Sequence, residues 1–219
     1  MLKAEKLHMV QVWDPLVRLC HWGIACLLPL CWYSAEIGAM NWHQSCAYAL
    51  ATLLLVRLCW GVWGSEPARF GHFVRSPCTV WDYVRGRMPA PAFGHNPLGA
   101  YMVLLLWLLL LAQFVSGLCI SDDIWTDGPL YGVVPSHVSR WMGRYHHQAF
   151  WFLAGAAVVH VCAVMIYRWR GIALLPAMIH GRAMHPAGLP KPELGSWWLG
   201  IGLLLGFSAL AAYFIVPLW

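Results

Sequence analysis

The sequence predicts an all-α integral membrane protein. Of its 219 residues, 60% are hydrophobic and only 11% are charged, whereas a soluble domain typically carries about 25% charged residues. The apolar residues are gathered in five runs, each close to the ~20 residues that an α-helix needs to cross a bilayer. We expect transmembrane helices at about 16–38, 42–63, 97–119, 144–167 and 197–217.

Local signals justify the start of each helix. Asp14 is a good N-cap before Pro15 at the first helical position, and no cleavage site follows, so we expect the first helix to stay as an anchor. Asn41 is the candidate cap of the second helix. The third begins after His95-Asn96-Pro97, and the fourth has an alternative, earlier start after Pro135-Ser136.

A stretch rich in proline and glycine, 185–195, separates the fourth helix from the fifth. The predicted organisation is therefore a four-helix core at 1–184, a linker at 185–196 and an additional transmembrane helix at 197–219.

Positive charge is unevenly distributed over the loops. The loop after the first helix has Glu36 and no Lys or Arg, and the loop after the third has three aspartates against two arginines. The basic residues gather on the N-terminal segment and after the second and fourth helices: Lys3, Lys6, Arg18, Arg69, Arg75, Arg85, Arg87, Arg168, Arg170, Arg182 and Lys191. The positive-inside rule therefore predicts a cytoplasmic N-terminus and an extracytoplasmic C-terminus. The net charge of +5 follows from this topology and does not indicate nucleic-acid binding.

The eight cysteines do not form a motif. Most lie inside or beside apolar runs, where Cys behaves as a small hydrophobic residue, and none forms a C-x-x-C pair. Zinc ribbons, thioredoxin-type dithiols and covalently attached c-type haem are therefore disfavoured.

Four histidines lie in the apolar runs or at their edges: His21, His43, His146 and His160. An ionisable side chain in the membrane is costly and usually faces a partner inside the bundle. The direction of each helix places His21 with His160 near the cytoplasmic side, and His43 with His146 near the outer side. The sequence thus predicts two depth-matched pairs.

The spacing in the fourth helix distinguishes His146 from its neighbour His147. Fourteen residues span about four turns, so His146 and His160 share a face about 21 Å apart along the axis. His147 lies about 140° from that face. We expect His146 to be the functional histidine of the adjacent pair.

Two histidines on facing helices, at each of two depths, suit bis-imidazole ligation of two haem irons. The small residues Gly23, Ala47, Ala154, Gly155 and Ala157 are candidate positions against which a flat ring could lie. Structural histidines, and a metal-ion or proton transporter, are the alternatives. Transporter sites usually lie near the midplane with carboxylates, and here the only acid near a span is Glu36.

Other polar residues have less specific interpretations. Arg57, in the cytoplasmic half of the second helix, either snorkels to the headgroups or neutralises haem propionates. We expect Arg18 to snorkel. His95 is expected to be a solvated histidine near the interface, with approach to a haem propionate as the alternative. We expect His72, His180 and His185 to be ordinary loop residues.

Several segments together resemble one family: VWDPLVRLCHW (12–22), VRLCWGVWGSEPARF (56–70), HNPLGAYMVLLLW (95–107), SGLCISDD (116–123) and the H-x13-H of the fourth helix. The chain is similar, over about residues 8–185, to the bacterial di-haem cytochrome b561 family and to cytochrome b subunits of membrane-bound nickel–iron hydrogenases. The resemblance implies a four-helix core with two b-type haems, and it puts the iron ligands at His21, His43, His146 and His160.

The resemblance also implies electron transfer in a respiratory chain of the bacterial cytoplasmic membrane. Electrons would pass between the quinone pool and a periplasmic partner, such as a cytochrome c, a hydrogenase-type subunit, or oxygen and superoxide. The chain would then be the redox subunit of a quinone-linked oxidoreductase. The acidic loop with Asp122, Asp123 and Asp127 is a candidate docking surface. The fifth helix, with Gly202 and Gly206 as a candidate packing face, departs from the four-helix pattern.

Overall fold

The computed structural model describes residues 7–87, 94–122, 126–186 and 190–218. Within these ranges, five helices are long and apolar enough to cross a membrane. They are α1 (Pro15–Glu36), α2 (Met40–Trp63), α5 (Pro97–Gly117), α6 (Ser136–Trp169) and α8 (Trp197–Ile215), the last continued by the 3-10 turn η2 (Val216–Leu218). The predicted five-helix membrane class is therefore confirmed.

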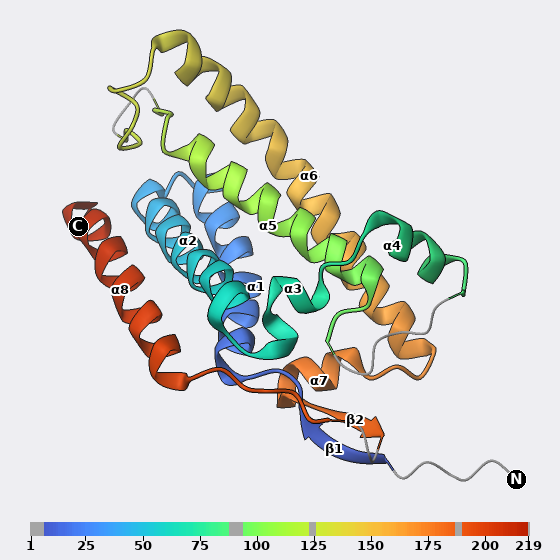
Figure 1. The fold of residues 1–219 in the computed structure, drawn as a ribbon. Helices are drawn as coiled ribbons and strands as arrows, with labels where there is room; N and C mark the ends of the chain where they lie inside the picture. The colour runs from blue at the N-terminus through green and yellow to red at the C-terminus, as the bar shows by residue number, and fades with distance from the viewer. Residues whose placement is uncertain (1–6, 88–93, 123–125, 187–189, 219) are drawn as a thin grey trace, which may run out of the picture.

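Short elements fill the connections at one end of the bundle. The chain between α2 and α5 forms η1 (Glu66–Ala68), α3 (Phe70–Phe73) and α4 (Pro77–Val84). The strand β1 (Leu7–Gln11) precedes α1, and α7 (Leu174–His180) and β2 (Arg182–Pro186) follow α6. We call this the sheet end of the bundle, and the opposite end, which holds the α1–α2 connection, the turn end (Figure 1).

Two of the predicted helix starts are confirmed by their caps. The Asp14 side chain accepts a hydrogen bond from the Val17 amide at 2.8 Å, and the Asn96 side chain accepts one from the Gly99 amide at 2.7 Å. In both helices proline occupies the first turn, where its missing N–H leaves no extra unsatisfied donor.

The prediction for Asn41 is wrong. The second helix is capped at Ala39, and the Asn41 amide instead donates to the carbonyl of Leu218 at 2.8 Å. This bond joins the start of α2 to the end of the chain. No local pattern around residue 41 signals a partner so far away in the sequence.

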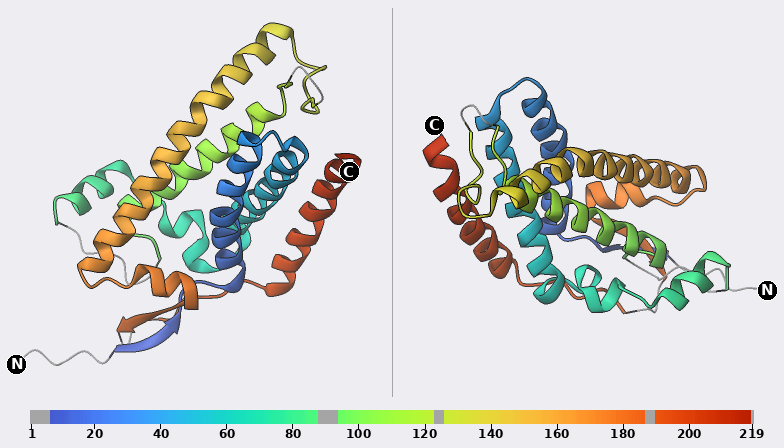
Figure 2. Two further views of the ribbon diagram at one scale, coloured as in Figure 1. Left: turned by 180° about the vertical axis from the view of Figure 1, so that it is seen from behind. Right: turned by 90° about the horizontal axis from the view of Figure 1, so that it is seen from above.

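The fourth predicted helix takes its earlier start, at Ser136. Its 34 residues span about 51 Å, longer than the ~30 Å hydrocarbon core of a bilayer. It packs along α5, whereas α1 packs against α2, and α8 lies on the far side of α2 (Figures 1 and 2). Leu54, Leu110 and Leu153, from α2, α5 and α6, meet in the buried centre.

The sheet end has structure that the sequence does not predict. Strands β1 and β2 pair antiparallel, with Gln11 opposite Arg182, so the first residues of the predicted linker belong to a strand. The later linker residues lie against the loop after α2, where the Gly195 amide donates to Ser65 Oγ at 2.9 Å. A buried cluster that includes Val10, Trp13 and Trp60 closes this end of the bundle.

Candidate functional site

The structure brings the four intramembrane histidines together in two pairs. The His21 and His160 rings have centroids 6.4 Å apart, with an angle of 58° between their planes. The His43 and His146 rings are 6.3 Å apart, at 79°. The first pair joins α1 to α6, and the second joins α2 to α6. This is the pairing that the depth of each histidine predicts.

The ring spacing is the same in both pairs and suits a shared metal ion. A bond between a metal ion and an imidazole nitrogen is about 2 Å long, and the ring centre lies about 1 Å further, so two imidazoles on opposite sides of one ion have centroids roughly 6 Å apart. The observed separations of 6.4 and 6.3 Å match this value. All four histidines are partly shielded from solvent.

The His146 ring is held by three residues at the end of α5. Its Nδ1 lies 2.9 Å from the carbonyl oxygen of Gln113 and 3.1 Å from Ser116 Oγ. The Gln113 side chain returns a bond, because its Nε2 donates to the His146 carbonyl at 2.9 Å. A Cβ at Gly117 would lie 3.1 Å from His146 Cε1, so glycine leaves room for the ring.

The His43 ring has a similar partner on α1. Its Nδ1 lies 2.8 Å from the carbonyl oxygen of Cys31, and Cys31 Sγ is 3.5 Å from the same nitrogen. A carbonyl oxygen has no hydrogen to give, so Nδ1 must be the donor in both His43 and His146. Their Nε2 atoms therefore carry free lone pairs, which is the form in which histidine binds a metal.

The pair at the sheet end is surrounded differently. His21 Nδ1 is buried and has no hydrogen-bond partner among the described residues. The His21 ring instead meets Trp22 edge-on, with centroids 4.9 Å apart. This pair still offers two imidazoles, each of which can bind a haem iron in its neutral form.

His147 does not take part in either pair. It is exposed, and its ring stands edge-on to that of His146 with centroids 6.2 Å apart. The helical spacing therefore predicts which of the two adjacent rings lies against His43.

Arg57 lies inside the bundle, only 4% exposed. Its guanidinium lies 4.7 Å from the centre of the Trp107 ring and donates to the Ala68 carbonyl at 3.3 Å. No carboxylate within 4 Å forms an ion pair with it in the described part of the chain. This inward position is incompatible with snorkelling. Arg18 does not snorkel freely either, because it donates to the Ile179 carbonyl at 2.8 Å.

The expectation that His95 is solvated is wrong. Its ring packs between Trp13 and Phe73, with centroids 4.8 and 5.2 Å away, and its Nδ1 is shielded from water. Burial, and then the charge of Arg57, lower the pKa of His95 to about 3. This histidine is therefore neutral near pH 7.

Two of the small residues proposed as ring contacts lie in opposite surroundings, one open and one packed against a helix. Gly155 is exposed, and a Cβ there would meet nothing within 4 Å. Gly23 is filled by the next helix, since a Cβ there would lie 2.5 Å from Leu53 Cδ1. Gln113, Ser116 and Gly117, which contact His146, are not among the residues that the sequence predicts for the site. The polar Gln113 in an otherwise apolar run was the available signal.

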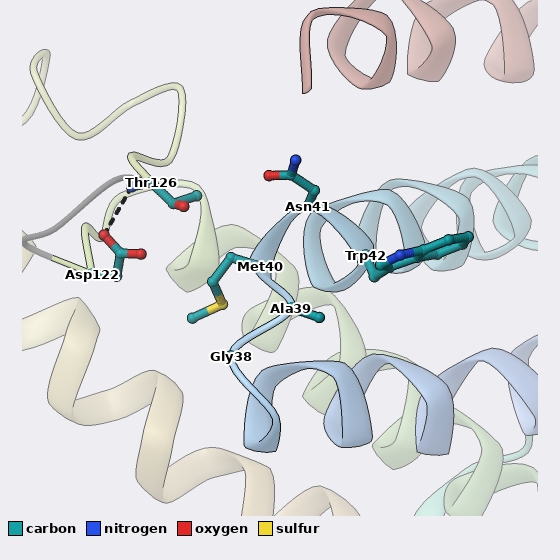
Figure 3. Close-up of a pocket in the computed structure, with 7 residues that line it drawn as sticks. All are labelled: Gly38, Ala39, Met40, Asn41, Trp42, Asp122 and Thr126. Atoms are coloured by element: carbon teal, nitrogen blue, oxygen red, sulfur yellow. Dashed lines mark hydrogen bonds between the residues drawn. The ribbon is translucent and has the colours of Figure 1, made fainter. Parts of the chain in front are cut away.

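No alternative metal site is present in the described ranges: no group of three or more His, Cys, Asp or Glu side chains could hold an ion there. A cavity of about 350 Å³ lies at the turn end, open to solvent (Figure 3). It is lined by the α1–α2 connection and by Asp122 and Thr126, whose amide donates to the Asp122 carboxylate at 2.8 Å.

Comparison with known proteins agrees with this geometry. The family model described as prokaryotic cytochrome b561 matches residues 12–181, which include all four histidines and Arg57. No curated protein sequence matches the chain significantly. Because the match covers most of the chain, the protein belongs to the prokaryotic cytochrome b561 family, whose members are multi-pass membrane proteins that bind haem b and transfer electrons.

Proposed function

We propose that the chain carries two b-type haems, each held by one pair of histidines. His21 and His160 hold one iron, and His43 and His146 hold the other. The observation that carries this proposal is the equal spacing of the two pairs, 6.4 and 6.3 Å between ring centroids. A haem iron would supply reversible one-electron redox chemistry.

The side chains around the pairs orient the imidazoles and exclude water. The carbonyls of Cys31 and Gln113 fix the tautomers of His43 and His146, so Nε2 is presented toward the bundle interior. Leu54, Leu110 and Leu153 fill the apolar space between the two levels. This buried packing would hold the ligands in place when the iron changes its charge.

Arg57 is proposed to bind a propionate of the haem at the sheet end. Asp14 acts on Arg57 without pairing with it within 4 Å in the described part of the chain, and a bidentate carboxylate is the partner that a guanidinium fits best. On α2, Arg57 follows His43 by fourteen residues, so it lies on nearly the same face at the level of the other pair. His95, beside it, would contact the same region of the ring.

The protein is proposed to span the bacterial cytoplasmic membrane with its sheet end in the cytoplasm. The loops and strands of that end hold Arg69, Arg75, Arg85 and Arg182, and the positive-inside rule places such loops in the cytoplasm. The C-terminus, at the turn end beside Asn41, would then be periplasmic.

The haems would exchange electrons with the quinone pool and with a periplasmic redox protein, such as a cytochrome c or a hydrogenase-type subunit. The chain would thus be the redox subunit of a quinone-linked oxidoreductase in a respiratory chain. The loop at the turn end carries Asp122 and the exposed Asp127, which would attract a basic partner surface. Asp123 lies outside the described residues.

The experiment that tests the proposal is a haem count on the purified protein. A pyridine-haemochrome assay should give two b-type haems per chain, and a reduced-minus-oxidised spectrum should show sharp low-spin bands. One haem per chain, or high-spin iron, would contradict the paired ligation. A haem-free chain from haem-replete cells would contradict the whole proposal and direct the next test to binding of metal ions.

A further inference from the structure

The two histidine pairs differ in their hydrogen bonds. At the turn end, both ligands donate from Nδ1 to a backbone carbonyl, at 2.8 and 2.9 Å. At the sheet end, His21 Nδ1 is buried without a partner among the described residues. The same donor set therefore lies in two unlike surroundings.

A hydrogen bond from Nδ1–H to an oxygen makes the imidazole a stronger electron donor. Electron density moves toward Nε2, and a more basic ligand stabilises the oxidised, more positive iron. Both ligands at the turn end have this bond. Their iron should therefore be harder to reduce than an iron between imidazoles that lack it.

Buried charge acts in the same direction. Arg57 is 4% exposed, and fourteen residues of α2 place it at the level of His21 and His160. The buried carboxylate of Asp14 acts on Arg57 as well, but it forms no ion pair with it within 4 Å, so it offsets the charge only in part. A nearby positive charge in a low-dielectric interior favours the reduced iron, which carries one charge fewer. The cations close to the turn-end pair, Arg140 and Arg144, are exposed, so water and salt screen them.

We propose that these two differences set the haem at the turn end to the lower reduction potential and the haem at the sheet end to the higher one. The proposal rests on the two-haem function above and adds a direction of electron transfer to it. One electron would move from the turn-end iron to the sheet-end iron, with no bond made or broken. In the proposed orientation this is inward transfer, from the periplasmic side to the cytoplasmic side.

The first test assigns the potentials by removing one haem at a time. Redox titration of the purified wild-type holoprotein should show two steps. His146→Ala should retain the high-potential step and His160→Ala the low-potential step. We expect the two steps to differ at least tenfold in the reduction equilibrium, which is about 59 mV for one electron. The reverse assignment, or equal potentials, would overturn the proposal, whereas a wild-type protein with fewer than two haems would contradict the proposed function itself.

The second test separates the charge from the hydrogen bonds. Arg57→Gln should lower the midpoint of the sheet-end haem more than that of the other, and Arg57→Lys should preserve it because the charge is kept. The matched control is Arg75→Gln, since Arg75 is an exposed cation at the same end, where water and salt screen its charge. Equal shifts of both midpoints in Arg57→Gln, or no shift, would contradict the role of Arg57.

The third test concerns the turn end. Gln113→Leu removes the side-chain bond to the His146 carbonyl and loosens the contact that aligns Nδ1 with the Gln113 carbonyl. The midpoint of the turn-end haem should rise, with the other unchanged. Gln44→Leu is the control, because Gln44 lies at the same end but donates to the Asp127 carbonyl instead. An unchanged midpoint in Gln113→Leu would remove the hydrogen-bond part of the proposal.

Discussion

At the scale of single residues, the Nδ1 atoms of His43 and His146 decide what these side chains can bind. Each lies within 3 Å of a backbone carbonyl, and the other ring nitrogen is left free. The sequence predicts which histidines pair, because depth and helical spacing depend only on position along each helix. It does not predict their acceptors, because every residue has a carbonyl and only tertiary packing selects one.

Gly117 has no side chain, and this leaves room for the His146 ring. In Gly117→Ala the new Cβ would lie 3.1 Å from His146 Cε1, so the ring or α5 must shift. We expect a cost of about 1–3 kcal/mol, as for other overpacked sites, and partial loss of the turn-end haem with the other retained. Haem content and thermal stability of the purified variant measure this.

Gly155→Ala is the matched control for that variant, since a Cβ there meets nothing within 4 Å. It should retain both haems and full stability. Haem loss of equal size in the two variants would show that helix substitutions in general, and not the His146 contact, cause the effect.

At the scale of helices and strands, local sequence signals predict where helices begin, and tertiary contacts explain the positions where these predictions fail. Asp14 and Asn96 cap their helices as their sequences indicate. Asn41 instead binds the Leu218 carbonyl, and the segment around His185 pairs with β1. Both exceptions join residues more than 170 positions apart, which no window of sequence can reveal.

The fifth helix is attached to the bundle through one face. Gly200 meets Leu16 and Trp60, Thr52 donates to the Phe207 carbonyl at 3.5 Å, and Tyr48 stacks on Phe214. Gly202 and Gly206, the predicted packing face, are not used for packing within the described part of the chain, because a Cβ at either position would meet nothing within 4 Å. The glycine that α8 uses for packing is therefore Gly200.

This attachment predicts different outcomes for two glycines on α8. In Gly200→Val the side chain would collide with Leu16, whose nearest carbon lies 2.9 Å from the added Cβ, so α8 should detach in part. We expect faster proteolysis of the 190–196 segment, with both haems retained in the four-helix core. Gly202→Val should behave like the wild type. Haem loss in Gly200→Val would contradict the division into a core and an added helix.

At the scale of the whole molecule, the two histidine pairs lie about 21 Å apart along α6, toward opposite ends of the bundle. The composition predicts the membrane class, and the charge of the loops predicts the direction of the chain. The sheet between β1 and β2 was not predicted, because its strands are short and come from opposite ends of the chain.

The orientation predicts which side of the membrane exposes Cys78. This thiol is exposed in α4, on the loop after α2, which the charge pattern places in the cytoplasm. A membrane-impermeant maleimide should label it in inverted vesicles and not in intact spheroplasts. Cys78→Ser should abolish that labelling, and Val133→Cys, at a site 77% exposed at the turn end, should react in spheroplasts. The reverse pattern would contradict the proposed topology.

The central claim is that four histidines act as two independent ligand pairs, and haem content of double variants tests it most directly. His146→Ala should retain one haem per chain, and adding His43→Ala should remove nothing further because both changes fall on one site. Adding His160→Ala to His146→Ala should instead abolish haem binding. His147→Ala is the control and should retain two haems. A His43→Ala/His146→Ala protein that has lost both haems while still folded, or one that keeps both, would contradict the pairing.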